Sequence, residues 1–177
     1  MTASVDLRAF IRDVPDFPKP GIVFKDIMPL LADPSALRAA VDDLAEWAEP
    51  RSPDLILGAE SRGFVLGSAL AYRLGIGFVA ARKPGKLPYR TVRETYALEY
   101  GEDALEIHVD AIEAGARVLV HDDLLATGGT ALATCRLAEG AGGTVVGCAF
   151  LLELAFLGGR ERLAAQDVHS LISYDSE

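Results

Sequence analysis

Two adjacent carboxylates and a loop of small residues are the part of this sequence best suited to chemistry. Asp122 and Asp123 end an apolar run, and after a short loop Gly128-Gly129-Thr130 opens a helical pattern. The free N–H groups and the dipole at a helix N-terminus favour a phosphate. The two glycines permit close approach of the backbone, and the hydroxyls of Thr127 and Thr130 can donate to the same oxygens.

The carboxylates suit a different chemical group. They would repel a phosphate, but they accept hydrogen bonds from sugar hydroxyls. A phosphate loop beside two acceptors for a diol describes a site for ribose 5-phosphate. The alternative is an ordinary strand-to-helix turn with a threonine cap and two solvated acids. A lone Thr-Gly-Gly-Thr would leave that alternative ahead, but the full arrangement favours the phosphate site.

The elements that must position this site alternate between strands and helices. Short apolar runs predict strands over residues 54–58, 77–81, 118–120, 144–151 and 168–174, and two further strands, 92–100 and 104–108, form a hairpin arm. Helices are predicted over 63–74 and 131–139, from Asp33-Pro34 onward, from Gly158-Gly159 onward, and loosely over 5–14. Residues 17–26 are too rich in proline and glycine for a helix. The order predicts an α/β domain with a mostly parallel sheet, whose ligands lie at the carboxyl ends of the strands.

Composition limits the classes of function. The 177 residues suit one domain, and half of them are hydrophobic, which argues against disorder. The formal net charge of −9 argues against nonspecific binding of nucleic acid. The positive charge is nevertheless local, because five basic residues fall between Arg82 and Arg93, which suits a polyanionic small ligand. The sequence shows no leader and no membrane-spanning apolar run, and its two cysteines lack metal-ligand spacing, so we expect a cytoplasmic protein.

A second strand-to-helix junction, Glu60-Ser61-Arg62-Gly63, could hold a pyrophosphate through its helix N-terminus, its hydroxyl and its guanidinium. By itself this tetrapeptide is a weak signal, and a surface turn is the commoner explanation. The sequence contains no Walker A motif, and Gly75-Ile-Gly77 lacks the third glycine of a dinucleotide-binding fingerprint. Nucleotide hydrolysis and hydride transfer therefore lose their main support.

The segment Val-His-Asp-Asp-Leu-Leu-Ala-Thr-Gly-Gly-Thr, residues 120–130, closely resembles the phosphoribosyl-pyrophosphate motif of the type I phosphoribosyltransferases. Its Leu-Leu-Ala is similar to the branch of the family that uses adenine. Four motifs in the family's order extend the resemblance over roughly residues 15–165. The resemblance implies a central, mostly parallel sheet flanked by helices, with a small hood formed mainly by about residues 1–32. His121 stands where the family usually has valine, and a structural role for this histidine is favoured.

For the sugar and its 5-phosphate, the resemblance implies contacts from Asp122, Asp123, Ala126, Thr127, Gly128, Gly129 and Thr130. For the pyrophosphate it implies Glu60, Ser61, Arg62, Lys83 and Lys86, with Arg82 reaching across a homodimer interface. A cis peptide is expected between Glu60 and Ser61. Mg²⁺ is implied as a substrate-bound ion, held mainly by pyrophosphate oxygens and water, so no residue is assigned as a metal ligand.

For the base, the resemblance places the carbonyl of Val23 and the N–H of Lys25 on the edge of adenine, with Phe24 stacked on the ring. Ala126 and Leu154 match positions that pack on the purine. Glu99 takes the position of the family's catalytic acid, and Tyr100 is a candidate for sealing the closed loop; the alternatives are an exposed strand acid and a structural tyrosine.

The implied reaction joins adenine and phosphoribosyl pyrophosphate to give AMP and pyrophosphate, as in purine salvage. One alternative is transfer to another purine, such as xanthine or hypoxanthine. Another is a regulator that senses phosphoribosyl pyrophosphate without catalysis, although the acidic chain offers no evident nucleic-acid surface.

Overall fold

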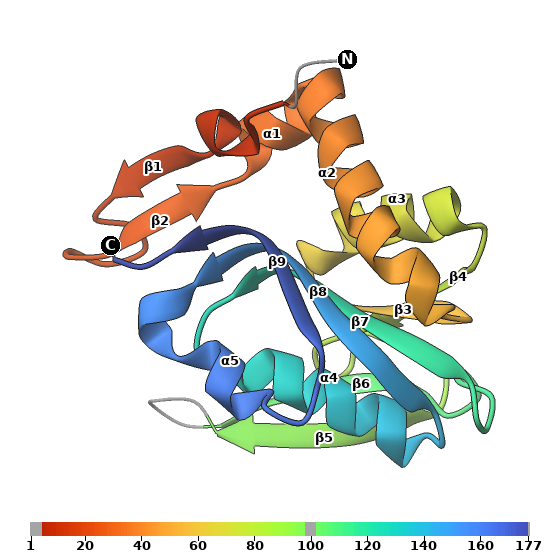
Figure 1. Cartoon of the computed structure of the whole chain (residues 1–177). Helices are drawn as coiled ribbons and strands as arrows, with labels where there is room; N and C mark the ends of the chain where they lie inside the picture. Colours follow the sequence, from red (N-terminus) through yellow and green to blue (C-terminus); the bar gives the residue numbers. More distant parts are fainter. Residues whose placement is uncertain (1–4, 98–101, 177) are drawn as a thin grey trace.

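A five-stranded parallel sheet forms the centre of the protein (Figure 1). The structure is a computed structural model that describes residues 5–97 and 102–176. The strand order is β4-β3-β7-β8-β9, with bounds Gly77–Ala81, Leu55–Ala59, Arg117–Leu125, Thr144–Leu154 and Val168–Tyr174. This confirms the predicted α/β fold with its parallel sheet.

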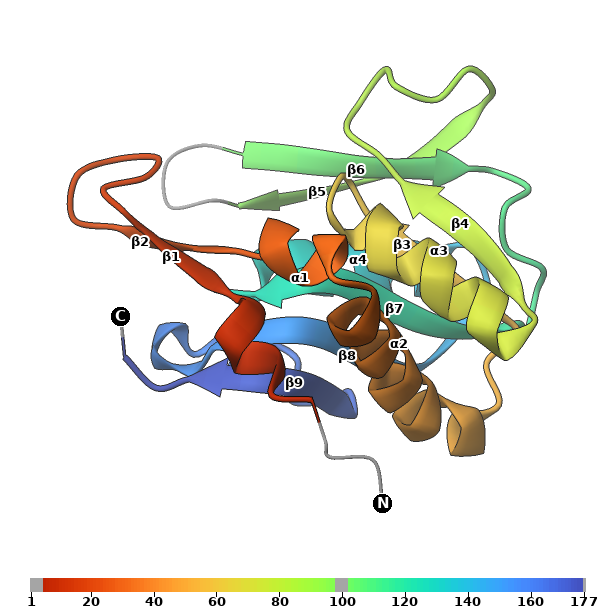
Figure 2. The same ribbon diagram turned by 90° about the horizontal axis from the view of Figure 1, so that it is seen from above.

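Helices cover both faces of the sheet (Figure 2). Helix α2 (Pro34–Ala48) and helix α3 (Gly63–Leu74) pack on one face, and α4 (Gly129–Gly140) packs on the other. The carboxylate of Asp33 caps α2, because it accepts from the backbone N–H groups of Ser35 and Ala36 at 2.9 Å, and Pro34 occupies the first helical turn. The predicted start of this helix is confirmed.

Alternate residues of the inner strands supply the two halves of the core. Ile56 and Leu119 pack with α2 and α3, whereas their neighbours Leu57 and Val118 pack with α4. All four side chains are fully buried. Because successive side chains of a strand point to opposite faces, a strand covered on both sides must be apolar throughout. That requirement explains why these runs were recognisable in the sequence.

The N-terminal segment differs from the prediction. A short 3₁₀ helix, Leu7–Phe10, is followed by β1 (Arg12–Pro15), which pairs with β2 (Val23–Asp26) in an antiparallel sheet of its own. The helix predicted over residues 5–14 is therefore wrong beyond Phe10. The pairing of β1 with a strand about ten residues later overrides the loose helical periodicity, and such a contact leaves no local signal. Helix α1 (Met28–Ala32) then leads into α2.

A second antiparallel hairpin lies beyond α4 (Figures 1 and 2). Its strands are β5 (Thr91–Ala97) and β6 (Glu102–His108), which confirms the predicted hairpin; residues 98–100 of the first predicted strand lie outside the described residues. The short elements that remain are two 3₁₀ helices, Glu49–Arg51 and Ala155–Leu157, and helix α5 (Gly159–Arg162).

Two strands of the central sheet are longer than predicted. Strand β7 continues through Asp122 and Asp123 to Leu125, and β8 continues through Glu153 to Leu154. The predicted end of β7 at the two acids is therefore wrong. The two strands stay paired here, with Leu125 opposite Glu153. Charged side chains remain in these strands because arginines from other segments bind them, as described below.

The two cysteines face each other across α4 and β8. The Sγ atoms of Cys135 and Cys148 lie 3.5 Å apart, and both residues are buried as free thiols. Contact with Cys135, reinforced by burial, raises the pKa of Cys148. Among the described residues, no helix combines the length and the apolar character needed to cross a membrane.

Candidate active site

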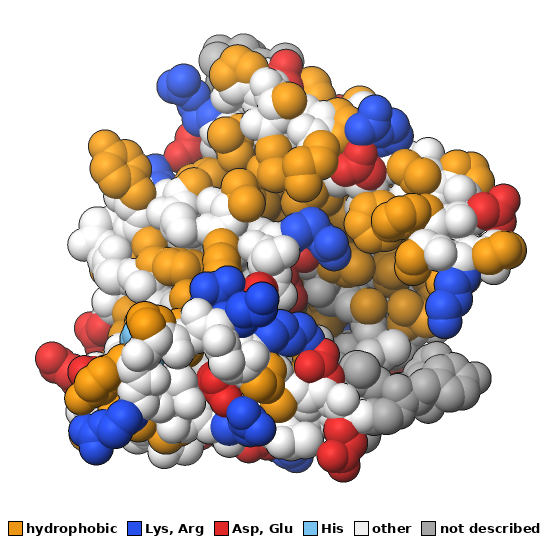
Figure 3. Space-filling view, turned by 180° about the vertical axis from the view of Figure 1, so that it is seen from behind, with side chains coloured by type: hydrophobic (Ala, Val, Ile, Leu, Met, Phe, Trp, Pro, Cys, Tyr) orange, Lys and Arg blue, Asp and Glu red, His pale blue; other side chains and the backbone are white. Residues whose placement is uncertain are grey.

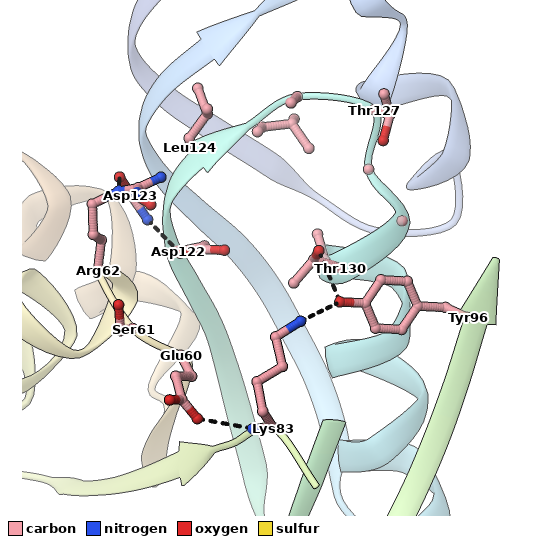
Figure 4. A pocket seen from close by; sticks show the side chains of 15 residues that line it. Glu60, Ser61, Arg62, Lys83, Tyr96, Asp122, Asp123, Leu124, Thr127 and Thr130 are labelled. Carbon is pink, nitrogen blue, oxygen red and sulfur yellow. Dashed lines mark hydrogen bonds and ion pairs between the residues drawn. The ribbon is translucent and has the colours of Figure 1, made fainter. Parts of the chain in front are cut away.

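A cavity of about 320 Å³ opens at the carboxyl ends of β3 and β7 and at the N-terminus of α4 (Figure 4). Four separate segments line it: residues 60–62, Lys83, Tyr96 and residues 122–131. Both strand-to-helix junctions that the sequence singled out therefore contribute to the same cavity. The position agrees with the rule that parallel sheets bind ligands at the carboxyl ends of their strands.

The loop before α4 has the geometry of an anion site. Gly128 lies in the left-handed region, with φ of +81°, and it precedes the first residue of a twelve-residue helix. Thr127 and Thr130 lie along the side of the cavity opposite Arg62 (Figure 4). Unpaired N–H groups at the start of α4, together with two hydroxyls, offer donors to phosphate oxygens.

The two carboxylates have different environments. Asp122 points into the cavity (Figure 4), and its backbone neighbour donates to it, because the N–H of Asp123 lies 2.9 Å from Asp122 Oδ1. Burial raises the pKa of Asp122 well above its usual range, and the negative charge of Asp123 raises it further. Asp123 is itself 5 % exposed and is bound by Arg62, whose Nε lies 2.5 Å from Asp123 Oδ2.

Arg62 connects the cavity to the N-terminal segment. Burial alone would lower its pKa, but the charge and hydrogen bond of Asp123 more than offset that effect, so the pKa is raised. The Cζ atom of Arg62 lies 5.3 Å from the centre of the Phe24 ring on β2, within the range of a cation–π contact. One guanidinium thus binds Asp123 and touches the predicted hood.

Four of the six residues predicted for pyrophosphate line the cavity: Glu60, Ser61, Arg62 and Lys83. The peptide between Glu60 and Ser61 is cis, as predicted. The other two, Arg82 and Lys86, do not line it. Arg82 instead donates to the Glu60 carboxylate at 3.3 and 3.4 Å and to the carbonyl of Lys86 at 3.3 Å.

The sequence analysis missed Tyr96, which lines the cavity from the hairpin, and Asp103, which binds both Tyr96 and Lys83. The hydroxyl of Tyr96 lies 3.4 Å from both Lys83 Nζ and Thr130 Oγ1 (Figure 4). The ammonium of Lys83 also pairs with Asp103, whose carboxylate accepts from Tyr96 at 3.2 Å. Tyr96 and Asp103 are cross-strand partners on β5 and β6. No motif marks them, since only the pairing of the hairpin brings them together.

Of the described residues predicted to bind the base, one lines the cavity and the others do not. Ala126 lines the cavity, whereas Val23, Phe24, Lys25 and Leu154 do not. On β2 the side chain of Phe24 faces Arg62, while that of Lys25 pairs with Asp13. The predicted catalytic Glu99 and the predicted Tyr100 lie outside the described residues, so their roles stay predictions.

Within the described residues, no group of three or more histidine, cysteine or acidic side chains is placed to hold a metal ion.

On the face seen in Figure 3, basic and acidic side chains lie interspersed among apolar ones, without the continuous basic surface typical of a nucleic-acid interface. Among the described residues, Arg62 and Lys83 bring positive charge to the lining of the cavity.

Comparisons with known proteins agree with this geometry. A family model described as "Phosphoribosyl transferase domain" matches residues 31–170. The adenine phosphoribosyltransferase of Desulfitobacterium hafniense is 58% identical over 97% of this chain and 99% of its own. A crystal structure of the Rhodothermus marinus enzyme of that name is 57% identical, with a TM-score of 0.91, covering 95% of this chain and 96% of that one. The Saccharomyces cerevisiae enzyme, crystallised with an imino-altritol bisphosphate and adenine, is 40% identical, with a TM-score of 0.88, and coverage is 93% and 96%.

Proposed function

The chain belongs to the phosphoribosyltransferase family, and from that premise we propose that it transfers the 5-phosphoribosyl group of phosphoribosyl pyrophosphate to adenine. The products are AMP and pyrophosphate, which makes the protein a glycosyltransferase of purine salvage. One observation carries the proposal at the level of the site. A phosphate loop at the start of α4 shares a single cavity with the acidic pair at the end of β7. A ribose 5-phosphate has a phosphate for the loop and hydroxyls for the acidic pair.

The proposed binding mode follows from the two ends of that cavity. The 5-phosphate lies against residues 127–130, where N–H groups and hydroxyls converge. Asp122 and Asp123 accept hydrogen bonds from the ribose hydroxyls. Arg62 supports this role, because it neutralises buried Asp123 without covering Asp122. The sugar is thereby held with its anomeric carbon toward residues 60–62 and Lys83.

The pyrophosphate leaving group is assigned to Ser61, Arg62 and Lys83, with Lys86 joining from the segment that follows β4 and Arg82 reaching across the dimer interface. The support is charge, since Lys83 has a raised pKa: burial opposes this, but the hydrogen bond that Lys83 donates to Asp103 outweighs it. The site suits Mg²⁺ that is bound mainly by substrate, because Arg62 already occupies one carboxylate of the acidic pair. When bound, the ion offsets negative charge on the pyrophosphate.

We assign the purine to the space between the cavity and the hood. N9 of adenine attacks C1 of the ribose, the bond from C1 to the pyrophosphate oxygen breaks, and the transition state has oxocarbenium character. Attack through N9 leaves the purine with one proton more than it carries in AMP, and the Glu99 carboxylate near N7 accepts that proton; in the reverse reaction Glu99 returns it as an acid. The separate sheet of β1 and β2 supports a hood formed mainly by residues 1–32, with Phe24 directed at Arg62.

A homodimer and a cytoplasmic location complete the proposal. Helix α3 exposes Val65 and Tyr72, at 48% and 90%, and a spacing of seven residues puts them on one side of the helix. Such an apolar face favours an interface between copies, across which Arg82 would reach. Two free thiols 3.5 Å apart fit a reducing compartment.

Steady-state rates with adenine, hypoxanthine and guanine test the assignment. Two backbone groups, the carbonyl of Val23 and the N–H of Lys25, would match the edge of adenine, and a 6-oxopurine would leave both unpaired. Sites of this kind discriminate by about 10⁴-fold. We expect that preference for adenine in kcat/KM. Comparable efficiency with hypoxanthine would assign the chain to another purine, and no transfer to any purine would favour a sensor.

A further inference from the structure

The backbone of the phosphate loop rests directly on a second glycine turn. A Cβ atom added to Gly128 would lie 2.5 Å from the carbonyl oxygen of Gly159, and one added to Gly159 would lie 2.1 Å from that of Ala126. Both distances are below any real Cβ contact, so residues 126–128 and Gly159 touch through main chain alone. A shift of Gly159 toward the loop would therefore displace the loop, and a shift away would remove its support.

Gly159 begins α5, a helix of only four residues. So short a helix cannot hold its own position, because isolated helices of this length are unstable. Two side chains anchor it. Leu163 is 1% exposed and packs in the cluster that contains Leu125 and Phe150. The second anchor is Arg160, the residue next to Gly159.

Arg160 binds Glu153 with two parallel hydrogen bonds. Its Nε lies 3.0 Å from Oε1 and its Nη2 lies 2.5 Å from Oε2, while Nη1 donates to the carbonyl of Val168 at 2.7 Å. The hydrogen bond from Arg160 lowers the pKa of Glu153 against the effect of burial. Glu153 is 5% exposed and pairs with Leu125 in the β7–β8 ladder, one residue before the loop begins. The pair therefore fixes α5 to the same point of the sheet from which the loop departs.

We propose that Arg160 is a positioning residue for the phosphate loop. Through its two hydrogen bonds with Glu153, it holds Gly159 against Ala126 and Gly128, and so sets the direction of the N–H groups that bind the 5-phosphate. Arg160 does not line the cavity, so it acts only through the backbone. The proposal rests on the function proposed above, because that function assigns the 5-phosphate to this loop.

Arg160→Gln and Arg160→Lys test the proposal, and Arg162→Gln is the matched control. Arg162 is exposed and belongs to the same short helix, so its replacement removes the same charge without touching Glu153. Lysine keeps the charge but cannot form the paired hydrogen bonds. Misplacement of a binding group by about 1 Å can cost up to about 10²-fold.

We expect Arg160→Gln to raise the KM for phosphoribosyl pyrophosphate and the Kd for AMP by about tenfold or more. The KM for adenine should stay within about twofold, and Arg160→Lys should lie in between. Arg162→Gln should match the parent. A split between the two KM values separates positioning from a general loss of fold, which would lower the active fraction and leave both KM values unchanged.

Two results would overturn the proposal: a folded Arg160→Gln protein with parental affinity for AMP, or equal changes in both KM values. If Arg160→Gln does not fold, Arg160→Lys and Glu153→Gln decide in the same way. Arg160→Lys keeps a charged partner for Glu153, and Glu153→Gln keeps a neutral hydrogen-bonding partner for Arg160. Failure of the proposed function is distinguishable, because the parent protein would then show no transfer at all.

Discussion

The Nε atom of Arg62 lies 2.5 Å from the Asp123 carboxylate, a side chain that is only 7% exposed. Arg62→Gln should leave that carboxylate without its partner, so we expect a loss of roughly 2 kcal/mol of stability, reduced from the fully buried case because Arg62 is 41% exposed. Thermal unfolding measures it. Arg73→Gln, near the other end of α3, is the matched control, because Arg73 is 44% exposed and binds exposed acids. Its loss should be below about 1 kcal/mol. Equal losses of stability in Arg62→Gln and Arg73→Gln would contradict a special role of the Arg62–Asp123 pair.

Asp122→Asn should stabilise the protein while weakening the binding of its ligand. Burial and the neighbouring Asp123 raise the pKa of Asp122 in the folded state, so the folded protein binds this proton more tightly than the unfolded chain. Its contribution to stability therefore falls as pH rises above the unfolded value of about 3.9. At pH 7 the variant should melt higher, by roughly 2–4 °C for each kcal/mol regained. Calorimetry with AMP and 2′-deoxy-AMP should show weaker binding of AMP and a smaller difference between the two ligands. Unchanged AMP affinity would remove Asp122 from the sugar site.

Glu99→Gln keeps the shape of the side chain but removes its ionisable proton. If Glu99 acts as base or acid near N7, turnover should fall by roughly 10²–10⁴-fold with binding of phosphoribosyl pyrophosphate retained. Single-turnover kinetics and donor titration measure the two effects separately. Glu102→Gln, at an exposed position of β6, is the control and should keep parental turnover. A Glu99→Gln enzyme with near-parental turnover would make Glu99 an ordinary surface acid.

His121→Val should make the protein more stable. His121 is fully buried beside Gly67 and Phe78, and among the described residues neither ring nitrogen has a partner at normal hydrogen-bond distance and angle, the Ala149 backbone making only a weaker contact. An unpaired buried polar group costs about 1–3 kcal/mol, part of which the smaller valine loses again in packing. We therefore expect a net gain of about 1 kcal/mol in chemical denaturation at pH 7.

The same variant should change the dependence of stability on pH. Burial lowers the pKa of His121 to about 4, against weaker opposing effects of Asp123 and the Ala149 backbone. Between about pH 6.5 and pH 4 the unfolded chain binds this proton and the folded one does not, so the parent loses stability as pH falls through that window. His121→Val lacks this loss. If both proteins lose the same stability between pH 7 and pH 5, His121 is not a buried neutral imidazole.

Tyr72→Glu should weaken the proposed dimer. The side chain is 90% exposed on α3, and burying a carboxylate there against an apolar partner would cost free energy of desolvation. Light scattering after size exclusion should show the mass of two chains for the parent and a concentration-dependent mixture for the variant. Val109→Glu, which charges another exposed apolar position, should leave the mass unchanged. A Tyr72→Glu protein as dimeric as its parent would place the interface elsewhere.

The elements that the sequence predicted best are those whose ends are marked by residues close to them in the chain. Helix α3 and strands β4 and β9 begin and end where they were predicted, because they are short, apolar and bounded by glycine or polar residues. The phosphate loop belongs to the same class, since a strand, a glycine pair and a helix follow each other directly in the chain. Each of these signals lies within about a dozen residues.

What the sequence did not show depends on partners far along the chain. The acids of β7 were read as the end of a strand because Arg62, which binds Asp123, stands 61 residues earlier. Strand β1 exists only through β2, and Tyr96 reaches the cavity only because β5 pairs with β6. Local periodicity carries no information on such pairings, so a prediction from one sequence misses them for a physical reason.

The facing thiols of α4 and β8 give this protein an internal reporter of unfolding. Only a thiolate reacts with an alkylating reagent, and burial together with the raised pKa of Cys148 suppresses that form in the folded chain. Labelling of either cysteine must therefore wait for α4 to separate from the sheet. Because α4 begins at the phosphate loop, a ligand bound there slows the same separation. The rate of alkylation thus measures ligand occupancy without any dye, tag or engineered site.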